Sequence, residues 1–339
     1  MIQRLLIVGL GSIGKRHARI ARNISPDAQI VVLRHRDCPG DPPPGVDHCV
    51  TTIEAAMEFG PQAAVIANPA SHHLEVAVSL ARVGVHLLVE KPISHNSRGV
   101  AELIDICDAS GLILMTGYNL RHLASLRRFR DYLRAGRIGR VISVRAEVGQ
   151  FLPSWRPGTD YRQSVSARAD LGGGVLLELS HDIDYLLWMF GDVEWVNATL
   201  HRGGSLEINV DDIAHLMIGF APMGAAAPVI AALSMDFVRH DWTRTCTAIG
   251  EAGSIRWDGV EGSVEVFDRD GVSWELLFQE SNERDATFIA EWREFVRCIE
   301  TGDRPTVSGH DGLAALRVVE AAWRSSEGGS VVQCGAPGS

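Results

Sequence analysis

A short apolar run at 5–8 leads into a glycine-rich segment, and a helix-forming stretch follows at 15–23. The segment reads Gly9-Leu10-Gly11-Ser12-Ile13-Gly14, and its place between strand and helix makes this G-x-G-x-x-G pattern more specific than an ordinary glycine-rich turn. The glycines permit a tight turn and close approach to a pyrophosphate, which the free N–H groups and dipole of the helix N-terminus hold. We therefore predict a dinucleotide-binding β-α unit. The residues expected at the phosphates are Gly9, Gly11, Ser12, Ile13 and Gly14.

Strand-like and helix-like segments then alternate as far as residue 116. Strands are expected at 29–33, 63–67, 86–90 and 112–116, and helices at 53–59, 71–83 and 97–110. This alternation predicts a doubly wound parallel sheet with helices on both faces, whose ligands bind beyond the carboxyl ends of the strands. Polar residues follow three of these strands, so we expect them to meet in one crevice. Those expected to contact a cofactor are Asn68, Pro69, His73, Glu90, Lys91 and Asn119, and those expected to contact a substrate are Tyr118 and Arg121.

The second predicted strand ends in basic residues where an acid is common. About 20 residues beyond the glycines, NAD sites usually offer Asp or Glu to the adenosine ribose, whereas this chain offers Arg34-His35-Arg36. Because positive groups suit a 2′-phosphate, Arg34 and Arg36 favour NADP over NAD. Asp37 follows immediately, and Arg34 could instead stack on adenine and accept either cofactor.

Lys91 stands out because the chain uses arginine almost everywhere else. Of 32 basic residues 30 are arginine, and the only lysines are Lys15 and Lys91. Lys91 follows an apolar strand, in Glu90-Lys91-Pro92, where an amine can take part in proton transfer near neutral pH and a guanidinium cannot. The alternative is a Glu90–Lys91 ion pair that caps the strand.

The segment 172–191 is apolar and bounded by glycines, and it predicts one buried helix. Glu178, His181, Asp182 and Tyr185 occupy positions i, i+3, i+4 and i+7, which at about 100° per residue places them on one stripe. Polar groups on a buried helix need partners or a cavity, so this stripe suggests a proton-transfer surface. The alternative is the solvent-facing side of an amphipathic helix.

A loop at 153–162, rich in aromatic and basic residues, follows a predicted strand at 141–151. Such side chains can stack on and hydrogen-bond a sugar ring or a phosphate, or they can form a subunit contact. The substrate-binding candidates here are Trp155, Arg156, Tyr161 and Arg168. Consecutive strands between 195 and 278 predict a large, mainly antiparallel open sheet in an α+β domain, and helices follow at 287–300 and 310–326.

The length of 339 residues suits two domains, each with its own core. We place them at 1–121 and 122–327, with a last helix able to pack back on the first domain and a flexible tail at 328–339. A net charge of −10 argues against binding to nucleic acid or an anionic membrane. Six scattered cysteines, and no apolar run of about 18 residues, predict a cytoplasmic protein with free thiols, no metal site and no membrane span.

Together, the motifs GLGSIG, ANPASHH, VHLLVEKP, TGYNLR and GGGVLLELSHDID and the late sheet resemble the glucose-fructose oxidoreductase, inositol dehydrogenase and MocA (Gfo/Idh/MocA) family. The resemblance covers almost the whole chain, and EKP is its most specific mark. It implies a Rossmann domain and a nicotinamide-dependent oxidoreductase that acts on a sugar or cyclitol. The family's lysine corresponds to Lys91, and its acid-and-histidine pair corresponds to Glu178 and His181. Much of the family has aspartate four residues before the histidine, whereas here Glu178 precedes His181 by three, which leaves His181 and Asp182 as alternatives at the reacting hydroxyl.

Alcohol oxidation sends a hydride to the nicotinamide and the hydroxyl proton to a base. We expect His181 or Lys91 to exchange that proton, the other to polarise the oxygen, and Glu178 or Tyr185 to orient them. We favour His181 over Asp182 because an imidazole titrates near neutrality. A homodimer or homotetramer through the second sheet is expected, since an exposed sheet needs covering. The alternatives to a dehydrogenase are a nicotinamide-assisted glycosidase, which recycles its cofactor, and a non-catalytic NADP-binding sensor.

Overall fold

The computed structural model describes residues 2–35, 42–222, 227–281 and 283–334, which form two compact units. Unit 1 comprises Met1–Asn119, Asp170–Gly172 and Asp285–Leu316, and unit 2 comprises Leu120–Ala169, Gly173–Arg284 and Arg317–Ser339. The predicted boundaries, 1–121 and 122–327, differ from this division chiefly because residues 285–316 return to unit 1.

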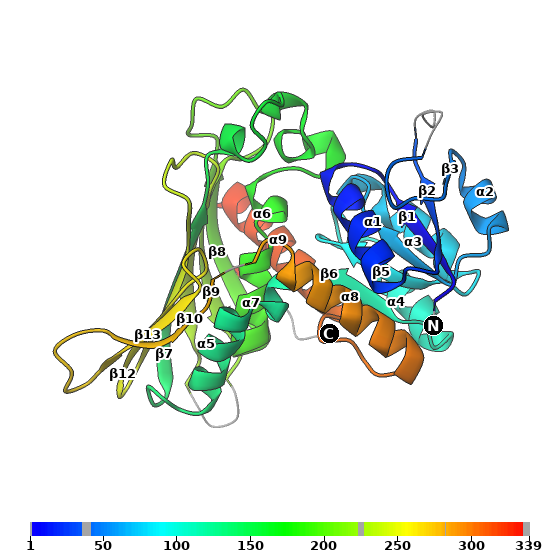
Figure 1. Ribbon diagram of the computed structural model, residues 1–339. Coiled ribbons are helices and arrows are strands. Elements are labelled where there is room, and N and C mark those ends of the chain that lie inside the picture. The colour runs from blue at the N-terminus through cyan, green and yellow to red at the C-terminus, as the bar shows by residue number, and fades with distance from the viewer. Residues whose placement is uncertain (1, 36–41, 223–226, 282, 335–339) are drawn as a thin grey trace. The chain divides into compact units, whose positions relative to one another are not determined.

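Unit 1 is built on a six-stranded sheet in which all neighbouring strands are parallel, in the order β3-β2-β1-β4-β5-β6. The strands are β1 (Arg4–Val8), β2 (Gln29–Leu33), β3 (His48–Val50), β4 (Ala63–Ile66), β5 (His86–Glu90) and β6 (Leu114–Gly117). The helices are α1 (Ser12–Ile24), α2 (Ile53–Glu58), the 3₁₀ turn η1 (Ala70–His72), α3 (His73–Ala81), α4 (Val100–Ala109) and α8 (Ala286–Thr301). Figure 1 shows strands and helices alternating along the blue and cyan part of the chain. The prediction of a parallel, Rossmann-like sheet is confirmed.

The central strands of this sheet are buried, which explains their uninterrupted apolar sequences. All four residues of β4 are buried, as are the last four of β5. Parallel strands covered by helices on both sides require such runs, because neither face meets water. Trp292 and Phe295 of α8 belong to the same core cluster as Leu5 and Ile7 of β1. The late helix therefore completes a core that the first strand begins.

Unit 2 contains a nine-stranded sheet in the order β14-β13-β12-β11-β7-β10-β9-β8-β15, in which only β7 and β10 pair in parallel. Its strands are β7 (Val141–Gly149), β8 (Val193–His201), β9 (Ile213–Phe220), β10 (Ile230–Asp236), β11 (Thr243–Gly250), β12 (Gly253–Asp258), β13 (Ser263–Asp268), β14 (Glu275–Gln279) and β15 (Val332–Gln333). The α-helices α5 (Ala124–Arg134), α6 (Val175–Glu178) and α7 (His181–Phe190) lie on one side of this sheet (Figure 1). The remaining helices are η2 (Asn119–His122), η3 (Leu152–Ser154), η4 (Tyr161–Gln163), η5 (Val165–Ala167), η6 (Ala169–Leu171) and α9 (Gly309–Gly328). The predicted large, mainly antiparallel sheet is confirmed.

Part of the tail that was expected to be flexible forms an edge strand. Val332 pairs with Val196 and Gln333 with Trp195, so β15 extends the sheet beside β8. Residues 335–339 lie outside the described part of the chain.

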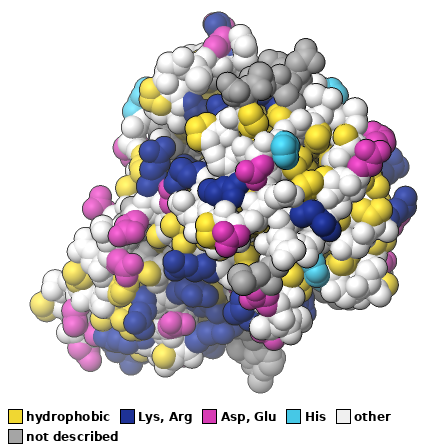
Figure 2. All heavy atoms as spheres, turned by 45° about the vertical axis from the view of Figure 1, so that its right-hand side comes forward, with side chains coloured by type: hydrophobic (Ala, Val, Ile, Leu, Met, Phe, Trp, Pro, Cys, Tyr) yellow, Lys and Arg dark blue, Asp and Glu magenta, His cyan; other side chains and the backbone are white. Residues whose placement is uncertain are grey.

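Helix α5 carries much of the arginine-rich segment 121–145. Ser125, Leu126 and Phe129 are buried, whereas Arg127 and Arg128 are exposed, as expected for an amphipathic helix with a solvated outer face. Figure 2 shows several basic side chains close together in the lower part of the face that the figure presents. Among the described residues, no helix has the length and apolar character needed to span a membrane.

Candidate active site

The glycines after β1 are required by the close approach of neighbouring backbone. Gly9 has φ +90°, and a Cβ atom there would lie 2.8 Å from the Asn68 backbone nitrogen at the end of β4. A Cβ on Gly14 would lie 2.1 Å from the Gly9 carbonyl oxygen. Because any side chain at these two positions would collide with backbone, the turn can pass close to the end of β4 only with glycine.

The N-terminus of α1 has the properties of an anion site. Its N-cap residue, Gly11, provides no side-chain acceptor, and the first turn contains no acid. Gly11 and Ser12 are exposed, and the space where a Gly11 Cβ would lie is open, with no atom within 4 Å. Unsatisfied N–H groups and the helix dipole at such an end bind phosphate groups. The residues present therefore fit the diphosphate of a dinucleotide.

His73, which was expected at the cofactor, joins two loops of unit 1. Its side chain is buried, with Nδ1 2.9 Å from the Pro92 carbonyl oxygen and Nε2 2.8 Å from the Asn68 carbonyl oxygen. Burial lowers the pKa of the imidazole, against the opposing effect of the two carbonyls. His73 therefore holds the segment after β4 against the segment after β5, and both ring nitrogens are already engaged.

Glu90 is the last residue of β5 and Lys91 follows it, at the same edge of the sheet. Glu90 is 7% exposed, and its Oε1 lies 2.7 Å from His17 Nε2 on α1. The Lys91 backbone N–H donates to Glu90 Oε2 at 3.1 Å. Burial acts to raise the pKa of Glu90, but the contacts with His17 and with the charge and backbone N–H of Lys91 together outweigh it, so the net shift is downward. Glu90 is thus a buried carboxylate, and the Lys91 side chain beside it is half-buried.

The residues after β6 differ in how they are held. Tyr118 is fully buried, and Asn119, which is 7% exposed, donates from Nδ2 to Thr287 Oγ1 of α8 at 3.0 Å. Arg121 belongs to unit 2, where Nε and Nη2 donate to the two carboxylate oxygens of Asp184 at 2.9 and 2.7 Å. Tyr118 and Arg121 were expected to bind substrate. In the structure both side chains are buried, at 0% and 2% exposed.

The prediction of one continuous helix across 172–191 is wrong. The segment forms two helices, since α6 ends at Glu178 and α7 begins at His181, with residues 179–180 between them. Glu178 accepts a hydrogen bond from Ser166 Oγ at 3.0 Å. His181, the first residue of α7, is half-buried. The spacing argument fails because the helical periodicity is interrupted between these two residues.

Asp182 and Tyr185 face the sheet of unit 2, and both are fully buried. Asp182 Oδ2 lies 3.1 Å from Arg244 Nη2 of β11, and the Tyr185 ring packs edge-on against Trp257 of β12 with 5.4 Å between centroids. Burial raises the pKa of Asp182, although Arg244 opposes the shift, and burial also raises the pKa of Tyr185 well above its usual value. These two side chains therefore anchor α7 to the sheet.

Three of the predicted substrate-binding residues meet in one small pocket of unit 2. The pocket is lined by Leu152, Pro153, Trp155, Arg156, Thr159, Tyr161, Ser164 and Ser166. Trp155 is fixed by its Nε1–H, which donates to the Gln150 carbonyl oxygen at 3.1 Å, and by edge-on packing against Phe237. Arg168, the fourth candidate, is exposed and is not among the lining residues.

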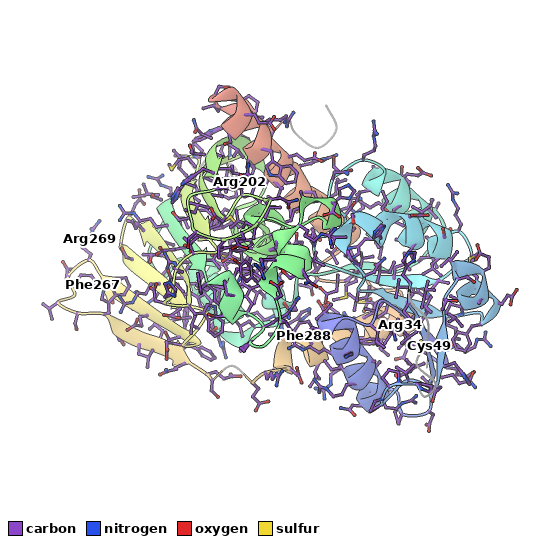
Figure 3. All side chains as sticks on the ribbon, turned by 90° about the horizontal axis from the view of Figure 1, so that it is seen from above. Arg34, Cys49, Arg202, Phe267, Arg269 and Phe288 are labelled. Atoms are coloured by element: carbon purple, nitrogen blue, oxygen red, sulfur yellow. The ribbon has the colours of Figure 1, made fainter. Side chains whose placement is uncertain are left out.

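Arg34 lies just beyond the end of β2, where its backbone N–H donates to Val50 of β3 at 3.0 Å. Cys49 precedes Val50 on β3, and Figure 3 labels both Arg34 and Cys49. Arg34 is half-buried and His35 is exposed. Arg36, the second residue predicted to contact the cofactor here, lies outside the described residues.

Comparison with protein families identifies the chain. Residues 3–118 match the model described as "Oxidoreductase family, NAD-binding Rossmann fold", and residues 126–256 match the "GFO/IDH/MocA C-terminal domain". The chain belongs to the Gfo/Idh/MocA family of oxidoreductases.

Relatives and solved structures extend this match across the chain. The family member named 1,5-anhydro-D-fructose reductase, from Ensifer adhaerens, is 27% identical over 87% of this chain and 84% of its own length. Myo-inositol 2-dehydrogenase of Thermotoga maritima is 26% identical over 96% of both chains. A levoglucosan dehydrogenase in complex with NADH and L-sorbose superposes with a TM-score of 0.84 at 20% identity, covering 99% of each chain.

Sequence reasoning missed the partners that hold this Gfo/Idh/MocA site together. His17, Thr287 and Trp292 contact Glu90, Asn119 and His17 respectively. A histidine three residues after the last glycine, on the apolar side of the first helix, was a signal for the first of them. Thr287 and Trp292 lie in α8, and helical periodicity gives no indication of which distant strand end a helix covers.

Proposed function

We propose that this protein transfers a hydride between a nicotinamide cofactor and a hydroxyl-bearing or keto carbon of a sugar, sugar derivative or cyclitol. The observation that carries the proposal is the uncapped, exposed N-terminus of α1, together with Lys91 at the end of another strand of the same sheet. Membership of the Gfo/Idh/MocA family supports the reaction class, and the names of its relatives support a sugar or cyclitol as substrate.

The bound nicotinamide supplies hydride transfer. In our proposal, the backbone N–H groups of Ser12 and Ile13 hold the diphosphate and Asn119 lines the crevice. Lys91 Nζ exchanges the proton of the reacting hydroxyl, because an ammonium can release and regain a proton as charge develops on that oxygen. His181 is the second candidate for this exchange, because its ring is half-buried whereas Asp182 is fully enclosed.

We propose a preference for NADP over NAD. The support is that the two described residues after β2, Arg34 and His35, are basic, whereas NAD sites usually offer an acid there. NADPH and NADH are titrated separately against wild type and Arg34→Ala, following nicotinamide fluorescence, with the exposed Arg269→Ala as a matched control. Tighter NADPH binding that weakens only in Arg34→Ala supports the preference, and tighter NADH binding that is unchanged by Arg34→Ala refutes it.

We also propose that the open face of the nine-stranded sheet binds a second copy of the chain. Met217 of β9 and Ile230 of β10 alternate with buried residues along their strands and are 43% and 38% exposed, so both place apolar side chains on this face that a second copy would cover. Sedimentation of wild type and Met217→Glu tests the idea. An oligomer that dissociates in the variant supports it, and a monomeric wild type contradicts it.

The experiment that tests the activity offers the protein, loaded with oxidised cofactor, a panel of sugars and cyclitols and records absorbance of the reduced nicotinamide. Accumulating reduced cofactor supports a dehydrogenase. Substrate cleavage without accumulation would indicate a nicotinamide-assisted glycosidase. Cofactor binding without turnover of any panel member would indicate a sensor.

A further inference from the structure

The side chains of His17, Glu90 and Trp292 form a buried hydrogen-bonded chain within unit 1 that ends at the backbone of Lys91. Trp292 Nε1 donates to His17 Nδ1 at 2.8 Å, and His17 Nε2 lies 2.7 Å from Glu90 Oε1. The other carboxylate oxygen of Glu90 accepts the Lys91 backbone N–H at 3.1 Å. Three elements far apart in sequence, α8, α1 and the end of β5, are thereby joined.

The direction of these bonds fixes the tautomer of His17. An indole N–H can only donate, so the Nδ1 atom that receives it must be unprotonated. A neutral imidazole with an unprotonated Nδ1 carries its proton on Nε2, and that N–H points at the Glu90 carboxylate. Trp292 therefore makes His17 a donor to Glu90.

Burial makes this donor important. His17 is 0%, Trp292 1% and Glu90 7% exposed. A carboxylate held in so apolar a place needs hydrogen-bond donors on its oxygens, because water cannot supply them. His17 satisfies one oxygen and the Lys91 backbone satisfies the other, so loss of the imidazole would free the carboxylate to reorient and to release Lys91.

The position of His17 on α1 links this carboxylate to the proposed diphosphate site. His17 lies one helical turn beyond Gly14, and its ring packs against Phe288 and Trp292 with centroids 5.8 and 6.0 Å apart. The Arg16 guanidinium covers the Phe288 ring at 4.7 Å, and Figure 3 shows Phe288 beside α1. Helix α8 therefore packs against the first turns of α1, and this packing restricts rotation of the His17 imidazole.

We propose that His17 is a positioning residue for Lys91: held by Trp292, it orients the Glu90 carboxylate that anchors the Lys91 backbone to the cofactor-binding helix. The inference rests on the proposed role of Lys91 in proton exchange. It adds that the position of Lys91 depends on His17 of α1, through the hydrogen bonds that Glu90 makes to both residues.

The first test needs neither cofactor nor substrate. Nitrogen NMR of the histidine rings, with His17→Gln used to assign the signal, reports which ring nitrogen of His17 carries the proton. The expected result is a proton on Nε2 and an unprotonated Nδ1 that shifts in Trp292→Phe. A proton on Nδ1 alone, or on both nitrogens, would overturn the proposal.

The second test compares His17→Leu, which removes the donor, with His17→Gln, whose terminal amide can still donate to Glu90. We expect His17→Leu to lower kcat by about 10- to 100-fold, the size of loss that misplacement by about 1 Å produces. Cofactor affinity should change by less than about threefold, and His17→Gln should recover most of kcat. Phe288→Leu, which alters the same packing without removing a hydrogen bond, serves as the control.

The outcomes separate this inference from the proposed function. If Lys91→Met abolishes turnover while His17→Leu keeps full kcat, the positioning role is wrong and the function stands. If both His17 variants lose kcat and thermal stability equally, the residue is merely structural and the inference fails. If wild type shows no nicotinamide-dependent turnover, the proposed function fails, and the NMR result still decides whether the hydrogen-bonded chain exists.

Discussion

Arg121 and Asp184 form a doubly hydrogen-bonded ion pair inside unit 2, with side chains only 3% and 1% exposed. The Arg121 guanidinium also covers the Trp188 ring at 5.6 Å. An arginine that stands five residues after a predicted strand end, in a segment rich in arginine, invites assignment to an anionic substrate. The buried pair shows that its charge is already neutralised within the protein.

Removing one partner of this pair should be strongly destabilising. Arg121→Met leaves the Asp184 carboxylate buried without its counter-charge, and we expect a loss of about 3–5 kcal/mol in unfolding free energy. The double variant Arg121→Met with Asp184→Leu should recover much of that loss. Urea unfolding monitored by tryptophan fluorescence measures both, with the exposed Arg127→Met as the control, and an unchanged midpoint in Arg121→Met would contradict the assignment.

Glu291 should make stability fall as pH rises. This α8 residue is fully buried, and both of its carboxyl oxygens lack a hydrogen-bond partner within the described residues. Burial, with the charges of Glu90 and Glu294, raises its pKa well above 4.5. The folded state therefore retains a proton that the unfolded state releases above pH 4.5, and stability declines by up to about 1.4 kcal/mol per pH unit until the folded pKa is passed.

Glu291→Gln removes this titration while keeping the shape of the side chain. We expect its stability relative to wild type to be unchanged below about pH 4 and to improve progressively between about pH 5 and 7. Thermal unfolding across this range provides the measurement, and the exposed Glu58→Gln provides the matched control. A variant that tracks wild type at every pH would show that Glu291 is not held protonated.

The two glycines at the start of α1 should respond differently to alanine. A Cβ at Gly14 would lie 2.1 Å from a backbone oxygen, so Gly14→Ala should disrupt the first β-α unit. A Cβ at Gly11 enters open space, so Gly11→Ala should fold normally but weaken cofactor binding, because its methyl group occupies the proposed diphosphate site. Circular dichroism and cofactor titration distinguish the two, and unchanged cofactor affinity in Gly11→Ala would place the diphosphate elsewhere.

Tyr185→Phe tests whether the phenol takes part in proton transfer. The hydroxyl is buried beside Asp182 and Cys246 in unit 2, so its removal should leave turnover within about threefold and should lower stability by no more than about 1 kcal/mol. Steady-state kinetics and thermal unfolding measure these quantities. A drop in kcat of about 100-fold or more would show that the Tyr185 phenol takes part in proton transfer.

The sequence predicted those parts of the fold and site that rest on local rules. Glycine spacing after β1 and apolar runs at β4 and β5 correctly indicated the parallel sheet and the edge to which Asn68, Lys91 and Asn119 belong. These features depend on neighbours in sequence and on the strict geometry of β-α units, which is why they could be anticipated.

Parts that depend on distant packing were not predictable in this way. The break between Glu178 and His181 separates side chains that an ideal helix would align. Nothing in the sequence near Glu90 indicates Trp292, which reaches it through His17 from about 200 residues away. Three polar side chains are buried in unit 2: Arg121, Asp182 and Tyr185. Two of them have charged partners that are distant in sequence, since Arg121 pairs with Asp184 and Asp182 with Arg244, and local sequence does not indicate such partners.

The measurement that bears most directly on the proposed function is turnover of wild type and Lys91→Met with a sugar or cyclitol that reduces the cofactor, alongside cofactor affinity for both proteins. We expect kcat to fall by about 100-fold or more in the variant with little change in the dissociation constant of the cofactor. Full turnover in Lys91→Met would contradict the assignment of proton exchange to this residue.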